Sequence, residues 1–198
     1  MASGAARLAS QHSGRFSVET VQLLLTDSYR RLAEHARVST HLVLLAERLT
    51  SERLDAPAHV EGAPGAGLPR VLFMCRHNAG RSQMAAALLA HRAGGQVTVS
   101  SAGTAPATEV EAGVARALLE AGVELTGAYP KPLTDEVIQA ADIGITMGRG
   151  DACPVVPGRR YLDWPVPDPE RAPIAVVRDI RDALDAHLTE LLGALPGS

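Results

Sequence analysis

Residues 71–85, with the sequence VLFMCRHNAGRSQMA, constrain the fold of this 198-residue chain more than any other segment. The first five residues form an apolar run that is typical of a buried strand, and the end of the segment has the pattern of a helix. Between them lies a seven-residue arc from Cys75 to Arg81. Asn78 and Gly80 are the residue types that most readily adopt a positive φ. A strand, an arc and a helix in succession predict an α/β fold with the arc at the carboxyl end of the strand.

The rest of the C-terminal part repeats this alternation. We expect strands at 71–75, 97–101, 142–147 and 160–164, and helices at 81–93, 109–121, 134–141 and 173–195. Gly122 supports the end of the second of these helices, because glycine is common just after a helix. Alternation of this kind predicts a parallel sheet covered by helices on both faces.

The N-terminal part has a different pattern. Apolar residues at helical spacing predict two amphipathic helices, over 17–35 and 39–54, and Ser17 is a suitable N-cap for the first. The stretch APAHVEGAPGAGLP has the composition of a linker. The predicted domains are therefore a helical bundle at 1–56, a linker at 57–69 and an α/β domain at 70–198.

Composition limits the classes of function. The net charge is −3, so any anion site must depend on local geometry, and a nucleic-acid partner is not expected. There is no apolar run of about 18 residues and no secretory signal, so no membrane contact is expected. Two cysteines without an export signal indicate free thiols in the cytoplasm.

The arc predicts an anion site with a nucleophile at its mouth. Successive backbone N–H groups can turn inward there, and the following helix adds its own free N–H groups. These donors also stabilise a thiolate, Arg81 supplies a planar fork for a tetrahedral oxyanion, and Ser82 can donate its hydroxyl to the sulfur of Cys75. The residues expected to bind the oxyanion are Arg76, His77, Asn78, Ala79, Gly80, Arg81 and Ser82. The alternative is that Cys75 is only a buried core cysteine; a nucleotide P-loop would need a lysine here.

The pattern Cys75-x-x-Asn78-x-Gly80-Arg81-Ser82 resembles the active-site loop of the low-molecular-weight tyrosine phosphatase fold. Gln83 stands where these phosphatases usually have proline, and it resembles the arsenate reductase branch. So do the stretch ITMGRGDACPVVPG and the segment from Trp164 to Asp168 and Pro169. The resemblance covers residues 70–198 and implies a four-stranded parallel sheet. It also implies that Asp168 is a catalytic general acid, while Trp164 is either a wall of the site or a core residue.

The resemblance further implies reduction of arsenate to arsenite, in arsenic detoxification, through a covalent intermediate between Cys75 and arsenic. Cys153 is the candidate resolving cysteine, but Gly148 and Arg149 stand where thioredoxin-coupled relatives have an inner cysteine. We therefore favour an external low-molecular-weight thiol, mycothiol or a similar molecule, with a glutaredoxin-like redoxin. Thioredoxin is the alternative donor. No bound cofactor and no metal site are expected.

Three alternatives remain open. One is a phosphatase acting on phosphotyrosine or small phosphates, although Glu170 and Arg171 replace the aromatic residues of a phosphotyrosine slot. Another is a non-catalytic oxyanion or arsenite sensor. The third is DNA binding, since LAEHARVSTHLV resembles the turn of a helix-turn-helix repressor. However, the first 69 residues carry seven Arg and seven Asp plus Glu, so this part is neutral. It lacks the basic face that contacts with DNA phosphates require. We expect the bundle to pack on the catalytic domain or on another subunit, as in a homodimer.

Overall fold

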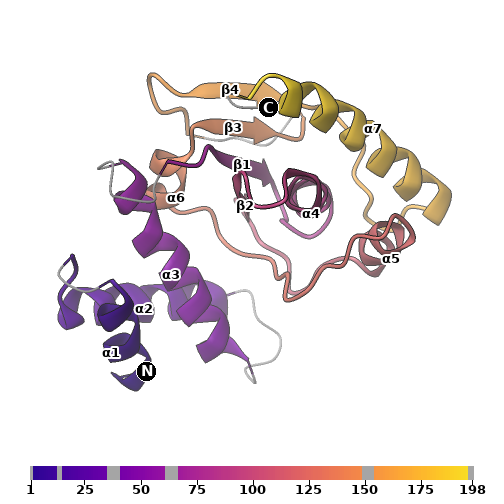
Figure 1. Cartoon of the computed structure of the whole chain (residues 1–198). Helices are drawn as coiled ribbons and strands as arrows, with labels where there is room; N and C mark the ends of the chain where they lie inside the picture. Colours follow the sequence, from indigo (N-terminus) through magenta and orange to yellow (C-terminus); the bar gives the residue numbers. More distant parts are fainter. Residues whose placement is uncertain (1, 13–14, 35–40, 61–66, 149–153, 196–198) are drawn as a thin grey trace. The chain divides into compact units, whose positions relative to one another are not determined.

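The computed structural model describes residues 2–12, 15–34, 41–60, 67–148 and 154–195. It divides into two compact units, one of residues 1–66 and 134–140 and one of residues 67–133 and 141–198. The elements of Figure 1 are the helices α1 (Ala2–Gln11), α2 (Val18–Ala33), α3 (Leu42–Val60), α4 (Arg81–Ala93), α5 (Ala112–Glu120), α6 (Asp135–Ala140) and α7 (Ile174–Gly193), and the strands β1 (Arg70–Cys75), β2 (Thr98–Gly103), β3 (Ile143–Thr146) and β4 (Arg160–Asp163). No helix in the described ranges is long and apolar enough to cross a membrane.

The four strands form one sheet in the order β2-β1-β3-β4, and every neighbouring pair is parallel. In the register of the sheet, Cys75 at the end of β1 lies beside Gly103 at the end of β2. The carboxyl ends of the strands therefore meet at the edge where the chain passes from Cys75 into the predicted arc. The predicted fold class, a four-stranded parallel sheet with flanking helices after an N-terminal set of helices, is confirmed.

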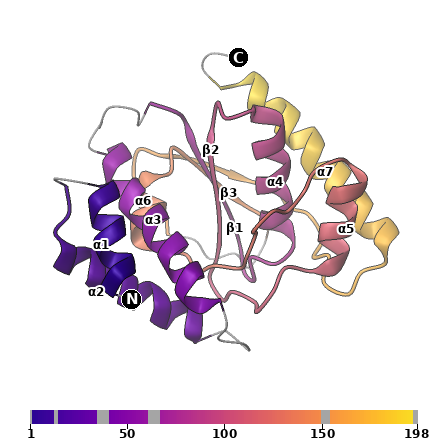
Figure 2. The same cartoon turned by 60° about the horizontal axis from the view of Figure 1, so that its bottom comes forward.

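Helices α4, α5 and α7 gather on one face of this sheet, as the two views in Figures 1 and 2 agree. Phe73 and Ile145 point from the central strands into the core and are fully buried there. Leu184 and Leu188 on α7 are also fully buried, because they lie four residues apart on the apolar stripe of that helix. These buried side chains hold α4 against β1, and they therefore determine where α4 begins.

Helices α1, α2 and α3 form the front bundle. Ser17 is the N-cap of α2, as predicted, and its side chain accepts a hydrogen bond of 3.1 Å from the backbone N–H of Thr20. The linker predicted from residue 57 begins too early, because α3 continues through Pro57 to Val60. Leu54 and Ala56 are buried just before Pro57 and the helix runs on through it, so the composition of this stretch does not mark where the helix ends.

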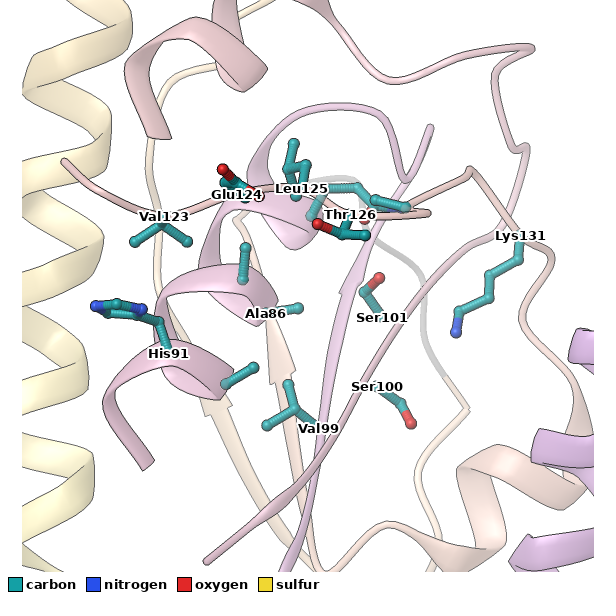
Figure 3. Close-up of a pocket in the computed structure, with 14 residues that line it drawn as sticks. Ala86, His91, Val99, Ser100, Ser101, Val123, Glu124, Leu125, Thr126 and Lys131 are labelled. Carbon is teal, nitrogen blue, oxygen red and sulfur yellow. The ribbon is translucent and has the colours of Figure 1, made fainter. Parts of the chain in front are cut away.

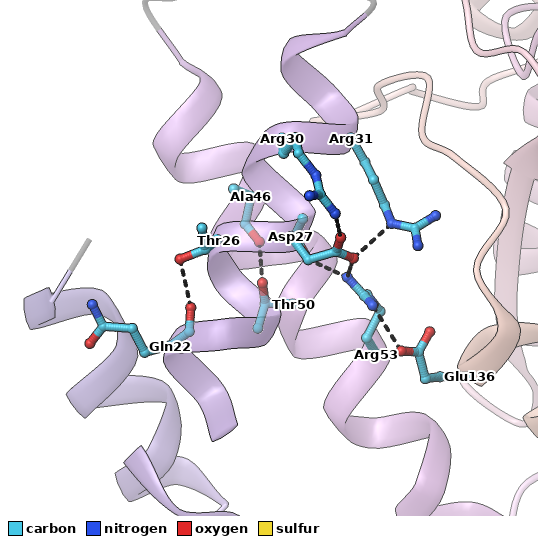
Figure 4. A network of polar contacts seen from close by, with 10 residues as sticks. Gln22, Thr26, Asp27, Arg30, Arg31, Ala46, Thr50, Arg53 and Glu136 are labelled. Atoms are coloured by element: carbon cyan, nitrogen blue, oxygen red, sulfur yellow. Dashed lines mark hydrogen bonds and ion pairs between the residues drawn. The ribbon is translucent and has the colours of Figure 1, made fainter. Parts of the chain in front are cut away.

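Helix α6 belongs to the same compact unit as the front bundle, although it lies between β-strands in the sequence. Figure 4 shows the contact that links it to α3: Arg53 donates to Glu136 at 2.8 Å and to Asp27 of α2 at 2.9 Å. Burial raises the pKa of Asp27, but hydrogen bonds from Arg31, Arg53 and Arg30 outweigh it and lower this pKa to about 2. The prediction placed residues 134–141 with the α/β domain alone and did not foresee this packing.

Candidate active site

The arc between β1 and α4 closes on the sulfur of Cys75. We call residues 75–82 the cradle. Asn78 adopts a φ of 47°, the left-handed conformation expected for it, and reverses the chain within the cradle. Its backbone N–H then points back at Cys75 Sγ, at 3.2 Å. The cysteine is therefore buried as a core residue would be, but its sulfur also has polar partners.

Ser82, in the first turn of α4, is the second partner of the sulfur. Its Oγ lies 2.9 Å from Cys75 Sγ and also accepts a 2.9 Å hydrogen bond from the side-chain amide of Asn78. A hydroxyl has one proton to donate, and the bond from Asn78 occupies one of its lone pairs. Either atom can donate in the Ser82–Cys75 contact, but toward an ionised sulfur only the Ser82 hydroxyl can donate.

The backbone of the cradle is anchored from outside by its carbonyl groups. Those of Arg76, His77 and Ala79 accept hydrogen bonds of 2.8, 2.9 and 3.0 Å from the N–H groups of Ala105, Ala107 and Glu111. In a trans peptide the carbonyl and the next N–H point in opposite directions. The N–H groups of residues 77, 78 and 80 therefore point inward, as an anion-binding concavity requires.

Gln83 supports the cradle through hydrogen bonds of its side-chain amide. Its amide nitrogen shares its two protons among the backbone oxygen of Asn78 at 3.1 Å, the side-chain oxygen of Asn78 at 3.0 Å and the backbone oxygen of Tyr129 at 2.9 Å. The side-chain oxygen of Asn78 also accepts from the backbone N–H of Lys131 at 2.9 Å. A proline at position 83 could make none of these bonds, so Gln83 has a structural role in this chain.

Arg81 and Asp168 meet although 87 residues separate them. One terminal nitrogen of Arg81 lies 2.9 Å from Asp168 Oδ2, and the other donates to the backbone oxygen of Met147 at 3.1 Å. The arginine side chain is 12% exposed and the aspartate side chain 44% exposed, so the pair forms at the mouth of the cradle. An incoming oxyanion would take the place of Asp168 on the guanidinium fork.

Of four further residues singled out in the sequence, the structure describes two. Trp164 is a core residue and not a wall of the site, because it is buried against Phe73, at 5.7 Å between ring centroids, and stacks on His187 at 5.0 Å. Gly148 adopts a φ of 115° and donates its N–H to Asp163 at 3.0 Å. Cys153 and Arg149 lie outside the described residues.

Glu111 is a site residue that the sequence pattern did not reveal. Burial raises its pKa above the ordinary value, the negative charges of Asp168 and Glu170 raise it further, and Arg81 opposes them. The one sequence signal is indirect: glutamate stands in front of α5, where serine, threonine, aspartate or asparagine is usual.

A pocket of about 380 Å³ lies beside the cradle, on the side of Gln83 (Figure 3). Its lining includes Ser101, Thr126 and Lys131, but not Cys75. This pocket is thus separate from the sulfur of Cys75. No group of three or more His, Cys, Asp or Glu side chains that could hold a metal ion occurs in the described part of the chain.

Comparison with known proteins agrees with this geometry. The chain belongs to the family described as low molecular weight phosphotyrosine protein phosphatase, whose model matches residues 70–197. A second model, a protein-tyrosine-phosphatase-like N-terminal domain, matches residues 1–58. The family resemblance seen in the Cys75 to Gln83 segment is confirmed.

Three relatives have arsenate reductase in their names. The structure is similar to that of a thioredoxin-dependent arsenate reductase from Corynebacterium glutamicum, with 45% identity, a TM-score of 0.87 and coverage of 96% of this chain and 94% of the other. An arsenate reductase of Halalkalibacterium halodurans is 29% identical over 127 residues, which are 60% of this chain and 91% of that protein. A glutaredoxin arsenate reductase of Synechocystis sp. is 24% identical over 131 residues, which are 65% of this chain and 99% of that protein.

Proposed function

We propose that this protein reduces arsenate to arsenite, with Cys75 as nucleophile. The observation that carries the proposal is the sulfur of Cys75, which has a backbone N–H at 3.2 Å and a hydroxyl at 2.9 Å, in a cradle flanked by the Arg81–Asp168 pair. Similarity along almost the whole chain to a named arsenate reductase supports arsenate as the oxyanion. The inward N–H groups suit any tetrahedral oxyanion of this size.

The first step forms a bond between Cys75 Sγ and arsenic. An arsenic–oxygen bond breaks, and the leaving oxygen takes a proton from Asp168 and departs as water. Arg81 and the inward N–H groups of the cradle hold the negative charge of the remaining arsenate oxygens. Ser82 lies 2.9 Å from the sulfur and donates its hydroxyl proton to it once Cys75 is a thiolate.

The second half of the reaction needs two electrons, which two thiols supply when they become one disulfide. We favour an external low-molecular-weight thiol, such as mycothiol, whose sulfur bonds to arsenic and displaces Cys75 as a thiolate. A thiol of a glutaredoxin-like redoxin then attacks the mycothiol sulfur, so that two electrons pass to arsenic, arsenite leaves and a mycothiol–redoxin disulfide forms. Gly148 and Arg149 in the place of an inner cysteine are the basis for this choice. In the competing route Cys153 attacks Cys75, arsenite leaves, and thioredoxin reduces the Cys75–Cys153 disulfide; the Corynebacterium relative is named as thioredoxin-dependent.

The second candidate is phosphatase activity, because the matching family model is that of a phosphatase and the cradle suits phosphate equally well. Glu170 and Arg171 follow Asp168-Pro169, and they give no aromatic surface for a phosphotyrosine ring. We therefore expect phosphate to bind as an inhibitor and p-nitrophenyl phosphate to be hydrolysed slowly, if at all.

The test is arsenate turnover measured side by side with two reducing systems. One contains thioredoxin and its reductase, and the other contains mycothiol with its redoxin. We expect turnover with the second system and none in Cys75→Ser with either, because a serine hydroxyl is not ionised in the cradle. Hydrolysis of p-nitrophenyl phosphate without any arsenate turnover would favour the phosphatase instead. Turnover with thioredoxin alone, lost in Cys153→Ser, would keep arsenate reduction and overturn the choice of donor.

A further inference from the structure

The pocket of about 380 Å³ in Figure 3 lies between α4, β2 and the segment that follows α5. Its volume is within the range of small-molecule sites, and all of its lining residues belong to one compact unit. The apolar part of its wall is built from small side chains, namely Ala86, Ala87, Ala90, Val99 and Val123. Because these side chains are short, they leave the space beside the sheet open.

Ser101 of β2 is the polar residue of this pocket that points to a ligand. It is only 5% exposed, and its hydroxyl makes no hydrogen bond with another residue of the described ranges. Figure 3 shows its oxygen turned toward Leu125 and Thr126, which form another wall of the pocket. Buried hydroxyls are rarely left unpaired, because burial without a partner costs free energy. The Ser101 hydroxyl is therefore available to a group that enters the pocket.

Lys131 brings a positive charge to the same end of the pocket. It is the one lysine of the sequence, and Figure 3 shows its ammonium extending toward Ser101. The ammonium lies 5.8 Å from the centre of the Tyr129 ring, a contact that helps to hold it in place. Glu124, the acidic residue of the lining, lies on the other side of the pocket in Figure 3. A hydroxyl and an ammonium together suit a carboxylate, which can only accept hydrogen bonds.

We propose that this pocket is a second binding site, and that it takes a small organic carboxylate with a short apolar chain. The carboxylate accepts hydrogen bonds from Ser101 and Lys131, and the chain lies against the alanines of α4. This site goes beyond the proposed function, because its lining does not include Cys75 and its occupancy needs no reaction.

Two residues of the pocket also hold the cradle. The side-chain amide of Gln83 and the backbone N–H of Lys131 both donate to the side-chain oxygen of Asn78, at 3.0 and 2.9 Å. Asn78 in turn donates its backbone N–H to Cys75 Sγ and its side-chain amide to Ser82. A ligand that contacts Gln83 and Lys131 restrains both donors of this oxygen. We therefore expect the pocket and the cradle to bind their ligands cooperatively.

The test of the site is a titration with hexanoate followed by NMR, with saturating phosphate present so that the cradle is already occupied. We expect the amide signals of β2 and of residues 123–131 to shift, and hexanamide, which has the same chain without the charge, to bind more weakly. Lys131→Gln should weaken hexanoate binding by about tenfold, and Ser101→Ala should weaken it less. The control is Arg160→Gln, which removes an exposed cation on β4, at the opposite edge of the sheet, and should change nothing.

Cooperativity is measured as the Kd for phosphate with and without hexanoate. We expect hexanoate to lower this Kd by about fivefold, and Gln83→Met, which has no amide to donate to Asn78, to abolish the response. An unchanged Kd while hexanoate is bound would overturn the link to the cradle. No binding of hexanoate, or equal binding by the unchanged protein, Lys131→Gln and Ser101→Ala, would overturn the site and leave the pocket to water. None of these measurements involves arsenate, so their outcome is independent of the proposed function.

Discussion

Half-buried carboxylates in the front bundle and beside the cradle differ in their hydrogen-bond partners, and their pKa values are shifted in opposite directions. In the front bundle Arg53 donates to both Asp27 and Glu136, and the pKa of each is lowered because these hydrogen bonds outweigh the effect of burial. Beside the cradle Glu111 has no such donor among the described residues, and its pKa is raised. Half-buried acids of the bundle thus hold helices together through a shared arginine, whereas Glu111 beside the cradle is not used in such a contact.

The comparison extends to the arginines. Arg53 is buried and donates to Asp27, to Glu136 and to the hydroxyl of Ser28, all in the same compact unit, which suits a fixed structural contact. Arg81 holds Asp168, whose side chain is 44% exposed. An ion pair of the second kind can open for a ligand at little cost, because solvent already screens it.

The largest effect that the comparison predicts is that of Asp168→Asn. Without a general acid, arsenate turnover should fall by roughly 10²–10⁴-fold. Binding of phosphate should be kept or improved, because Arg81 is no longer held by a carboxylate. Steady-state kinetics with phosphate as competing inhibitor measures both. A rate that is unchanged across pH would show that Asp168 only shapes its turn.

Replacing Arg53, which binds two carboxylates of the bundle, should lower the stability of the protein and leave its turnover close to normal. Arg53→Met leaves Asp27 and Glu136 without their common partner, and breaking a buried pair costs about 3–5 kcal/mol. We expect the low end, because these two side chains remain 22% and 29% exposed. The control is Arg7→Met, which breaks the exposed ion pair with Glu47.

Urea unfolding measures the loss, and arsenate turnover of the folded Arg53→Met protein should be close to normal. If Arg53→Met is as stable as Arg7→Met, the buried network does not hold α3 against α6. A folded but inactive Arg53→Met protein would show that the bundle contributes to the site.

Gly80→Ala tests how closely the acid loop must approach the cradle. The added methyl group meets Pro169 Cγ at 2.5 Å, so Pro169 and the preceding Asp168 must move. A displacement of about 1 Å at a reacting group can cost roughly 10²-fold in rate. The control is Gly113→Ala in α5, where a Cβ would meet Val177 at an ordinary 3.7 Å. Equal rates in the two variants would mean that the loop adapts to a side chain at position 80.

The smallest effect concerns acid stability of the bundle. The pKa of Asp27 in the folded protein, about 2, lies below its ordinary value of 3.8. Its contribution to stability is therefore complete above about pH 4 and is lost as the pH falls toward 2. Urea unfolding of the unchanged protein and of Asp27→Asn should converge over this range. A difference that stays constant down to pH 2 would mean that the charge of Asp27 does not stabilise the bundle.

The structural features that could be predicted from the sequence are those that depend on residues close together in the chain. The strand, the arc with Asn78 at positive φ and the helix after it are local consequences of apolar and turn residues, and they were predicted correctly. The cap at Ser17 is local in the same sense. The pairing of Arg81 with Asp168 agrees with the family resemblance, but no local pattern could have predicted a contact across 87 residues.

What the sequence could not predict is non-local. The packing of α6 on α3 joins residues 83 positions apart through Arg53 and Glu136. The surroundings of Glu111 depend on a loop almost 60 residues further along the chain. Pro57 and the Gly- and Pro-rich stretch after it suggested a linker, whereas α3 runs through Pro57 to Val60.

The most direct test of the central claim is a single-turnover experiment with the reduced full-length protein, arsenate and one equivalent of mycothiol. The products are arsenite, measured by arsenic speciation, and the mass of the peptide that contains Cys75. We predict arsenite or a mycothiol–arsenic species in amounts that match the protein, with a transient arsenic adduct or disulfide on Cys75, and neither product in Cys75→Ser. Arsenite in equal amounts from Cys75→Ser, or a Cys75 peptide that is never modified while arsenite forms, would contradict the assignment of Cys75 as the nucleophile.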